Sequence, residues 1–320
     1  MLAAAVSASQ PGADSDHIWR SNETSLGVAA PNDPVEKELQ KLMEQDDEAQ
    51  AEADKWIREN DEFAAKGAGA PPVELKRRIK ERFEVVRKGY EDFLQRHPNN
   101  TRGRVAYASF LGDLEGEDAA QAQLEKALSL DTNNPAVYNN LANIYGHHGP
   151  VKKAFEYYAK AIQINPQEPV YFHNFGTTVY LFRKDAKEYY GINENEVFAK
   201  AFELYSNAMR LDPQDFPLAS DVAQTYYGIQ PMRTDEALGA WTNALKIAPD
   251  EIEREGVYIH MARINTLAGR FAAAHAHLNA ITNEKYTELK RRVARTLAER
   301  ENPAPSTNSA SSKVELKKEP

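Results

Sequence analysis

Eight histidines are the residues best suited to metal binding or acid–base chemistry, because the chain contains no cysteine. His275 and His277 lie two positions apart on an expected helix, about 200° around it, and so cannot hold one metal from the same face. His147 and His148 are adjacent in an expected turn, where their side chains diverge. No zinc-protease helix, phosphate-binding glycine loop or nucleophile elbow occurs. These features predict a chain that is not an enzyme and that holds no metal or cofactor.

A helix–turn–helix pattern with a period of 34 residues recurs roughly five times between Thr101 and about Glu288. In the clearest copy, residues 135–168, small and aromatic residues line one face of each helix and Pro166 ends the second. Small residues let the paired helices approach closely, and aromatic residues fill the gaps between them. These residues are Tyr138, Leu141, Ala142 and Tyr145 in the first helix, and Ala154, Tyr158 and Ala161 in the second.

The same spacing recurs in the second helices of the other copies. In four of the five second helices, an alanine is followed four positions later by a leucine or aromatic residue, and three positions after that by another alanine. In the fifth helix, Ile281 replaces the last alanine. The residues are Ala120, Leu124 and Ala127; Ala201, Tyr205 and Ala208; Ala237, Trp241 and Ala244; and Ala274, Leu278 and Ile281.

This pattern resembles the tetratricopeptide repeat, with tyrosine replacing the tryptophan and phenylalanine of the family pattern and alanine replacing its glycine. The resemblance covers about 190 residues of the chain. It implies an all-α, right-handed α-solenoid of helix–turn–helix repeats with capping helices at both ends. It also implies a concave groove, built from the first helix of each repeat, that binds other proteins.

Polar positions on these first helices form the candidate peptide-binding groove, and in the register of the repeats we expect them to be exposed. Asparagine and glutamine donate and accept hydrogen bonds together, which suits the backbone of an extended peptide. Tyrosine and histidine add flat contact area at a small cost in entropy. The alternative is a purely structural surface, because any solvent-facing groove needs polar residues. The positions are Asn139, Asn140, Asn143, His173, Asn174, Thr177, Tyr180, Asp221, Gln224, Tyr227, His260 and Arg263.

Tetratricopeptide co-chaperones that hold the C-termini of heat-shock chaperones use two asparagines and three basic residues on this face. Asn143 and Asn174 match the asparagine positions, whereas Asn139, Val170 and Asp221 stand where basic residues are needed. Without those cations a terminal carboxylate is held poorly. The comparison therefore favours contact with a peptide backbone over a carboxylate clamp.

The net charge of −9 is confined to the first part of the chain. Residues 1–70 contain 15 acidic and 6 basic residues, so residues 71–320 are balanced, with 33 of each. A neutral repeat array lacks the basic face that nucleic acids require, and we expect no nucleic-acid partner. No run of 18 apolar residues occurs, so no membrane span is expected.

Composition divides the chain into segments. Residues 1–10 resemble the end of a secretory signal with cleavage after Ala8, which favours an exported or periplasmic protein over a cytoplasmic one; a disordered alanine-rich terminus is the alternative. The expected segments are a disordered leader (1–33), an N-terminal helical cap and half-repeat (34–98), the five-repeat array (99–288), a C-terminal capping helix (284–301) and a disordered tail (302–320).

Two finer features are expected within these segments. The cap begins at Asp33-Pro34, continues as an amphipathic helix of two or three pieces, and is broken by the glycine- and proline-rich residues 67–72. The third repeat carries an insertion near residues 182–196 that mixes aromatic and charged residues. This insertion is either a functional loop or an extension of the preceding helix.

Together these observations predict a non-catalytic scaffold or adaptor that binds a peptide or helix of a protein partner in the concave groove. The alternative is an accessory subunit of an enzyme or envelope complex that docks through its convex face and N-terminal helix. Nothing in the sequence identifies the partner.

Overall fold

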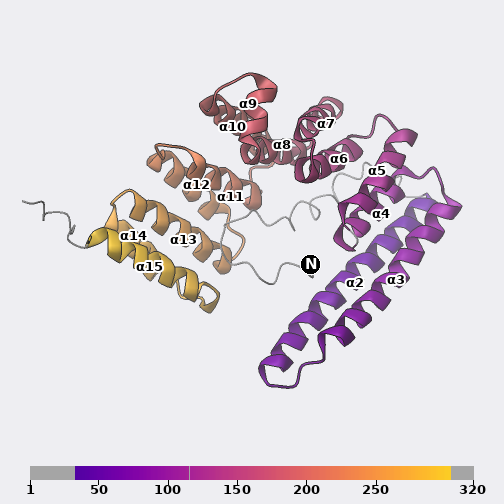
Figure 1. Ribbon diagram of the computed structural model, residues 1–320, viewed down its shortest axis with the longest axis horizontal. Coiled ribbons are helices and arrows are strands. Elements are labelled where there is room, and N and C mark those ends of the chain that lie inside the picture. Colours follow the sequence, from indigo (N-terminus) through magenta and orange to yellow (C-terminus); the bar gives the residue numbers. More distant parts are fainter. Residues whose placement is uncertain (1–32, 115, 304–320) are drawn as a thin grey trace, which may run out of the picture. The chain divides into compact units, whose positions relative to one another are not determined.

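The computed structural model describes residues 33–114 and 116–303, and all regular secondary structure in these ranges is helical. The chain divides into two compact units, one ending at Leu211 and the other beginning at Asp212. Within each unit, helices pair as hairpins in chain order, as expected of an all-α solenoid (Figure 1). Apart from Asp33, Asn302 and Pro303, the predicted leader and tail lie outside the described residues.

Three repeat hairpins make up most of the first unit: α4 packs on α5, α6 on α7, and α8 on α10. The α2–α3 hairpin precedes them and contacts α4, while α9 lies within the third hairpin. The helices are α2 (Pro34–Ala65), α3 (Pro72–Arg96), α4 (Thr101–Leu114), α5 (Glu117–Leu130), α6 (Pro135–His148), α7 (Val151–Ile164), α8 (Pro169–Leu181), α9 (Arg183–Tyr190) and α10 (Glu194–Leu211).

Buried alanines close these hairpins, as the repeat pattern predicts. Both alanines of each second helix are fully buried in α5, α7 and α10. Gly176 of α8 faces the Tyr205 ring of α10, and a Cβ added there would lie 2.9 Å from that ring. Only glycine therefore allows α8 and α10 to pack at this distance.

Helix α2 begins where the sequence predicts. The Asp33 carboxylate accepts a hydrogen bond from the Val35 backbone N–H at 2.9 Å, and Pro34 occupies the first helical position. The prediction of two or three helical pieces is wrong, because α2 is continuous over 32 residues. No glycine or proline lies inside it to interrupt the backbone hydrogen bonds.

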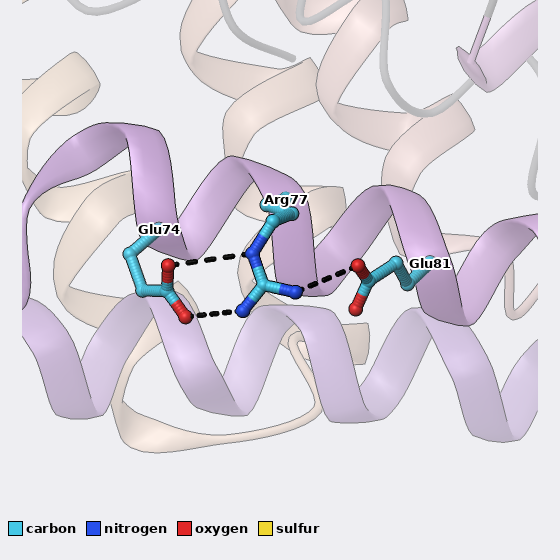
Figure 2. Close-up of polar contacts among 3 residues, drawn as sticks. All are labelled: Glu74, Arg77 and Glu81. Carbon is cyan, nitrogen blue, oxygen red and sulfur yellow. Dashed lines mark hydrogen bonds and ion pairs between the residues drawn. The ribbon is translucent and has the colours of Figure 1, made fainter.

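The two halves of the α2–α3 hairpin differ in how they are held. Near α4, a core of buried apolar and aromatic residues joins α2, α3 and α4. Near the connection between the helices, the exposed Arg77 guanidinium pairs within α3 with Glu74 at 2.5 Å and with Glu81 at 2.7 Å (Figure 2). Between α2 and α3, Arg82 pairs with Glu52 at 2.8 Å, and the Arg78 guanidinium lies 3.8 Å from the centre of the Trp56 ring. Exposed pairs of this kind add little stability. We refer to the end of the hairpin near this connection as its far end.

The second unit contains the last two repeat hairpins, in which α11 packs on α12 and α13 on α14. Helix α15 covers α13 and α14 with Val293 and Leu297. The buried Glu255 carboxylate of α13 accepts hydrogen bonds from the backbone of Thr282 and Asn283 and so fixes the connection to α15. The elements are α11 (Phe216–Thr225), η2 (Tyr226–Gly228), α12 (Thr234–Ile247), α13 (Glu251–Leu267), α14 (Phe271–Asn279), η3 (Glu284–Tyr286) and α15 (Thr287–Glu301).

The insertion in the third repeat contains a helix of its own. Helix α8 ends at Leu181, Phe182 leaves the helical conformation with φ −102° and ψ 47°, and α9 begins at Arg183. Gly191, with φ +66°, ends α9. The insertion is thus neither a long loop nor an extension of α8. None of the described helices is long and apolar enough to cross a lipid bilayer.

Candidate functional site

The twelve predicted groove residues fall into two groups, one in each unit. In the first unit, α6 carries Asn139, Asn140 and Asn143, and α8 carries His173, Asn174, Thr177 and Tyr180. In the second unit, α11 carries Asp221 and Gln224, η2 carries Tyr227, and α13 carries His260 and Arg263.

The expected exposure of the three asparagines on α6 is wrong. Asn139, Asn140 and Asn143 are between 0% and 2% exposed. Every residue of α6 from Ala136 to Gly146 is buried except Tyr138, so this helix is enclosed on nearly all sides. A partner could not reach these side chains without displacing the packing around them.

Two hydrogen-bond networks explain how the asparagines are accommodated. The Tyr158 hydroxyl of α7 donates to the Asn143 Oδ1 at 2.5 Å, and the Thr178 hydroxyl of α8 donates to the Tyr158 oxygen at 3.2 Å. The Asn174 Nδ2 donates to the Asn139 Oδ1 at 3.2 Å and so joins neighbouring repeats. Buried polar groups persist when they are paired in this way. These asparagines therefore link helices in addition to any part they take in binding.

Sequence reasoning missed the partners in these networks. The repeat pattern predicts that Tyr158 packs among the small and aromatic residues between paired helices, yet its hydroxyl joins Asn143 to Thr178 across three helices. Burial raises the pKa of the Tyr158 hydroxyl well above its usual value, which keeps it a hydrogen-bond donor. A tyrosine in place of the phenylalanine of the repeat pattern was the available signal, because a buried hydroxyl needs a partner.

The α8 stripe, which we define as His173, Asn174, Thr177 and Tyr180, remains partly accessible. The four residues lie at helical spacing on one side of α8, and all are half-buried. Thr177 shares a hydrogen bond with the Tyr205 hydroxyl at 3.2 Å. The Arg183 guanidinium lies 5.0 Å from the centre of the Tyr180 ring. The stripe thus offers amide, hydroxyl and aromatic groups in fixed positions.

In the second unit, three of the five predicted residues form one cluster. The Tyr227 hydroxyl lies 3.2 Å from the His260 Nδ1, and the Arg263 guanidinium lies 4.9 Å from the Tyr227 ring centre. The His260 ring stacks on Trp241, with centroids 4.2 Å apart and planes at 10°. Burial, together with the Arg263 charge, lowers the pKa of His260 to about 4. His260 is therefore an uncharged, packed side chain near pH 7. Asp221 and Gln224 are half-buried.

The structure also corrects the expectation for the paired histidines. His147 and His148 are the last residues of α6 rather than turn residues. Their side chains do not diverge: His147 Nδ1 and His148 Nε2 lie 2.6 Å and 2.8 Å from the two carboxylate oxygens of Glu117. They therefore join the end of α6 to the start of α5.

Comparisons with known proteins agree with this architecture. The family model described as a tetratricopeptide repeat matches residues 135–168. Pseudomonas aeruginosa PilF is 16% identical with a TM-score of 0.52, covering 78% of this chain and 98% of PilF. PilW, a type IV pilus biogenesis factor, is 16% identical with a TM-score of 0.55, covering 76% of this chain and 98% of PilW. A comparison with curated proteins finds no match.

At these identities the two structural likenesses concern the fold alone, whereas the family match concerns the sequence of one complete repeat. That repeat coincides with the α6–α7 hairpin, and the other hairpins carry the same alanine spacing. Tetratricopeptide repeat proteins are generally non-catalytic modules of protein interaction. Residues 135–168 are therefore a tetratricopeptide repeat, and the other described hairpins share its alanine spacing and helical-hairpin fold.

Proposed function

We propose that this protein is a non-catalytic scaffold or adaptor that binds a peptide or helix of a protein partner along the first helices of its repeats. The α8 stripe carries the proposal. Asn174, Thr177 and Tyr180 present polar and aromatic groups that are needed neither for the apolar packing between paired helices nor for the turns between them. The Asn174 amide is oriented by Asn139, and Thr177 is held by Tyr205, so both are positioned before a partner arrives. Positioned groups lose little entropy on binding.

Asn143 has a smaller part in this proposal than the sequence predicts. Its Oδ1 is used by Tyr158, while its buried Nδ2 has no hydrogen-bond partner in the described part of the chain. Substituting Asn143 would break a buried network, so loss of binding could not be separated from loss of folding. The side chains of the α8 stripe are half-buried and lie outside this network, but Asn174 donates a hydrogen bond to the buried Asn139, so the folding of any Asn174 variant is measured together with its binding.

Adding bulk and charge to the α8 stripe is expected to prevent partner binding. The variant Asn174→Arg with Thr177→Arg places two long side chains where the partner would lie. Tagged protein is incubated with extract of the native host, and retained proteins are quantified by mass spectrometry. We expect retention of the specific partner to fall at least about tenfold, which corresponds to ~1.4 kcal/mol of binding free energy.

The matched control is Gln163→Arg with Ser206→Arg, which adds the same charge at exposed positions of the second helices α7 and α10. It should retain the partner as well as the unaltered protein does. Equal retention by both double variants, with unchanged helicity measured by circular dichroism, would rule out binding at the α8 stripe.

One observation favours the alternative of an accessory subunit that docks through its N-terminal helix. Near the connection between α2 and α3, the side chains of Ile57, Phe63 and Val73 are 36%, 54% and 78% exposed. Exposed apolar side chains that gather into one patch mark docking surfaces, and these three residues supply such side chains at one end of the hairpin. Replacing all three with serine leaves the buried core with α4 intact. Loss of partner retention in this variant, with retention unaffected by the α8 substitutions, would favour the accessory-subunit function.

A further inference from the structure

We propose that the insertion between α8 and α10 forms a second contact site, which takes an acidic segment of the partner polypeptide. The insertion borders a shallow pocket of about 330 Å³ that is open to solvent. Three of its five lining residues are cationic, one is a carboxylate and one is apolar. They are Leu181 at the end of α8, Arg183, Lys184 and Lys187 on α9, and Glu194 at the start of α10. We refer to these five residues as the α9 pocket.

Helix α9 is a packed element, so the pocket is held in shape. Ala186 is fully buried. The Tyr189 and Tyr190 rings lie 5.3 Å and 5.9 Å from the ring of the buried Phe155 on α7. On the outer surface, Glu188 pairs with Lys152 of α7. One side of α9 therefore binds the repeats, and the basic side chains lie on the side that lines the pocket.

Arg183 is fixed, whereas the two lysines are available. The Arg183 guanidinium donates to the Tyr180 carbonyl at 2.8 Å and lies 3.7 Å from the Glu194 carboxylate. Among the described residues, no carboxylate lies within ion-pair distance of Lys184 or Lys187. These two lysines are exposed and three positions apart on α9, so they share one side of the helix. The pocket thus presents two exposed lysine charges, of which Lys184, after Lys152, also helps to lower the pKa of Glu188.

The lining chemistry favours spaced carboxylates as the ligand. Glu194 partly neutralises Arg183 and repels a concentrated dianion such as phosphate, whereas single carboxylates can each approach one lysine. Leu181, half-exposed beside the lysines, adds an apolar contact. A segment with two acidic residues next to an apolar one fits this combination. The α9 pocket lies outside the repeat pattern, because no α-helix is inserted within the other hairpins in the described residues.

The pocket is continuous with the α8 stripe, because Arg183 lies over the ring of Tyr180. A segment bound along the α8 stripe would therefore reach the α9 pocket at the C-terminal end of α8. The inference rests on the proposed function, because the α9 pocket would add a preference for acidic residues in the same partner that binds the α8 stripe. It can fail separately, because binding at the α8 stripe does not require the two lysines.

Hexaglutamate with blocked termini is the probe, titrated into the full-length protein and followed by nitrogen-15 NMR at low salt. Signals of the α9 backbone and of the Arg183 Nε are expected to shift. The variant Lys184→Gln with Lys187→Gln should weaken binding about tenfold. Each exposed ion pair between a lysine and a glutamate of the probe raises the affinity several-fold at most, and the variant removes two such pairs. The control variant Lys126→Gln with Lys160→Gln removes the same charge from exposed positions on α5 and α7 and should change the affinity less than twofold.

Three outcomes would overturn the inference: α9 signals that do not shift, equal weakening in both double variants, or inorganic phosphate that displaces hexaglutamate at comparable concentration. The first two would indicate no site or general charge attraction, and the third would indicate a simple anion site. None of them affects the α8 test, in which the partner is retained or lost through Asn174 and Thr177.

Discussion

Replacing Phe155 with alanine is expected to lower the free energy of unfolding of the first unit by about 3–5 kcal/mol. Phe155 is fully buried, and its ring packs against those of Phe175 on α8 and of Tyr189 and Tyr190 in the insertion. The cavity left by alanine would remove the contact that holds α7, α8 and α9 together. Hydrogen exchange of the α7 and α8 backbone amides measures this loss for the first unit alone.

Tyr189→Ala is the matched control for this prediction. The Tyr189 side chain contacts the same ring but is 38% exposed, so its loss should cost less than about 1 kcal/mol. Phe155→Ala should also abolish hexaglutamate binding at the α9 pocket, because α9 loses its support. A cost below about 1 kcal/mol for Phe155→Ala would mean that α9 does not depend on this aromatic contact.

Replacing Asp46 with asparagine is expected to stabilise the protein at neutral pH. Asp46 is buried in α2, where it accepts hydrogen bonds from Gln50 and from the Tyr90 hydroxyl, each at 3.0 Å. Burial raises the pKa of the Asp46 carboxyl from 3.8 to about 6 in spite of these bonds. The folded protein therefore binds this proton more tightly than the unfolded chain does.

The sign of the pH dependence follows from this difference. The contribution of Asp46 to stability is fully present below pH 3.8 and is lost as the pH rises to about 6, because the unfolded chain ionises first. At pH 7 the cost is on the order of 2–3 kcal/mol, at 1.36 kcal/mol for each unit of pKa. Asparagine avoids the buried charge and keeps an acceptor for Tyr90.

Unfolding by urea at pH 3.5 and at pH 7 tests this prediction. Asp46→Asn should gain up to ~2 kcal/mol over the unaltered protein at pH 7 and little at pH 3.5. Glu48→Gln, which removes the same charge from an exposed position two residues further along α2, should change stability by less than about 0.5 kcal/mol at either pH. A destabilised Asp46→Asn variant at pH 7 would show that the ionised carboxylate is favourable in the fold.

The repeat architecture could be predicted because its signal is periodic. Alanines such as Ala154 and Ala201 recur at fixed spacing, and they are fully buried because nothing larger fits between paired helices. The start of α2 could be predicted because Asp33 and Pro34 are local capping signals. Both kinds of signal depend on the spacing of residues along the sequence, so they can be recognised without knowledge of the folded structure.

The errors concern contacts between distant residues. Asn139 and Asn143 were expected to be exposed because they are polar, but α6 is enclosed and its asparagines are paired with Asn174 and Tyr158. The insertion was expected to be a loop or part of α8, but the packing of its tyrosines against Phe155 stabilises a separate helix. The spacing of the repeats shows which residues share one side of a helix, but it does not show which sides of that helix are covered by other helices in the fold.

Hydrogen exchange of the protein with and without its captured partner tests the central claim most directly. Binding along the first helices predicts new protection in the backbone of α8, extending into α9 if the acidic-segment inference holds. Protection confined to the far end of the α2–α3 hairpin, with α8 and α9 exchanging as in the free protein, would contradict this account.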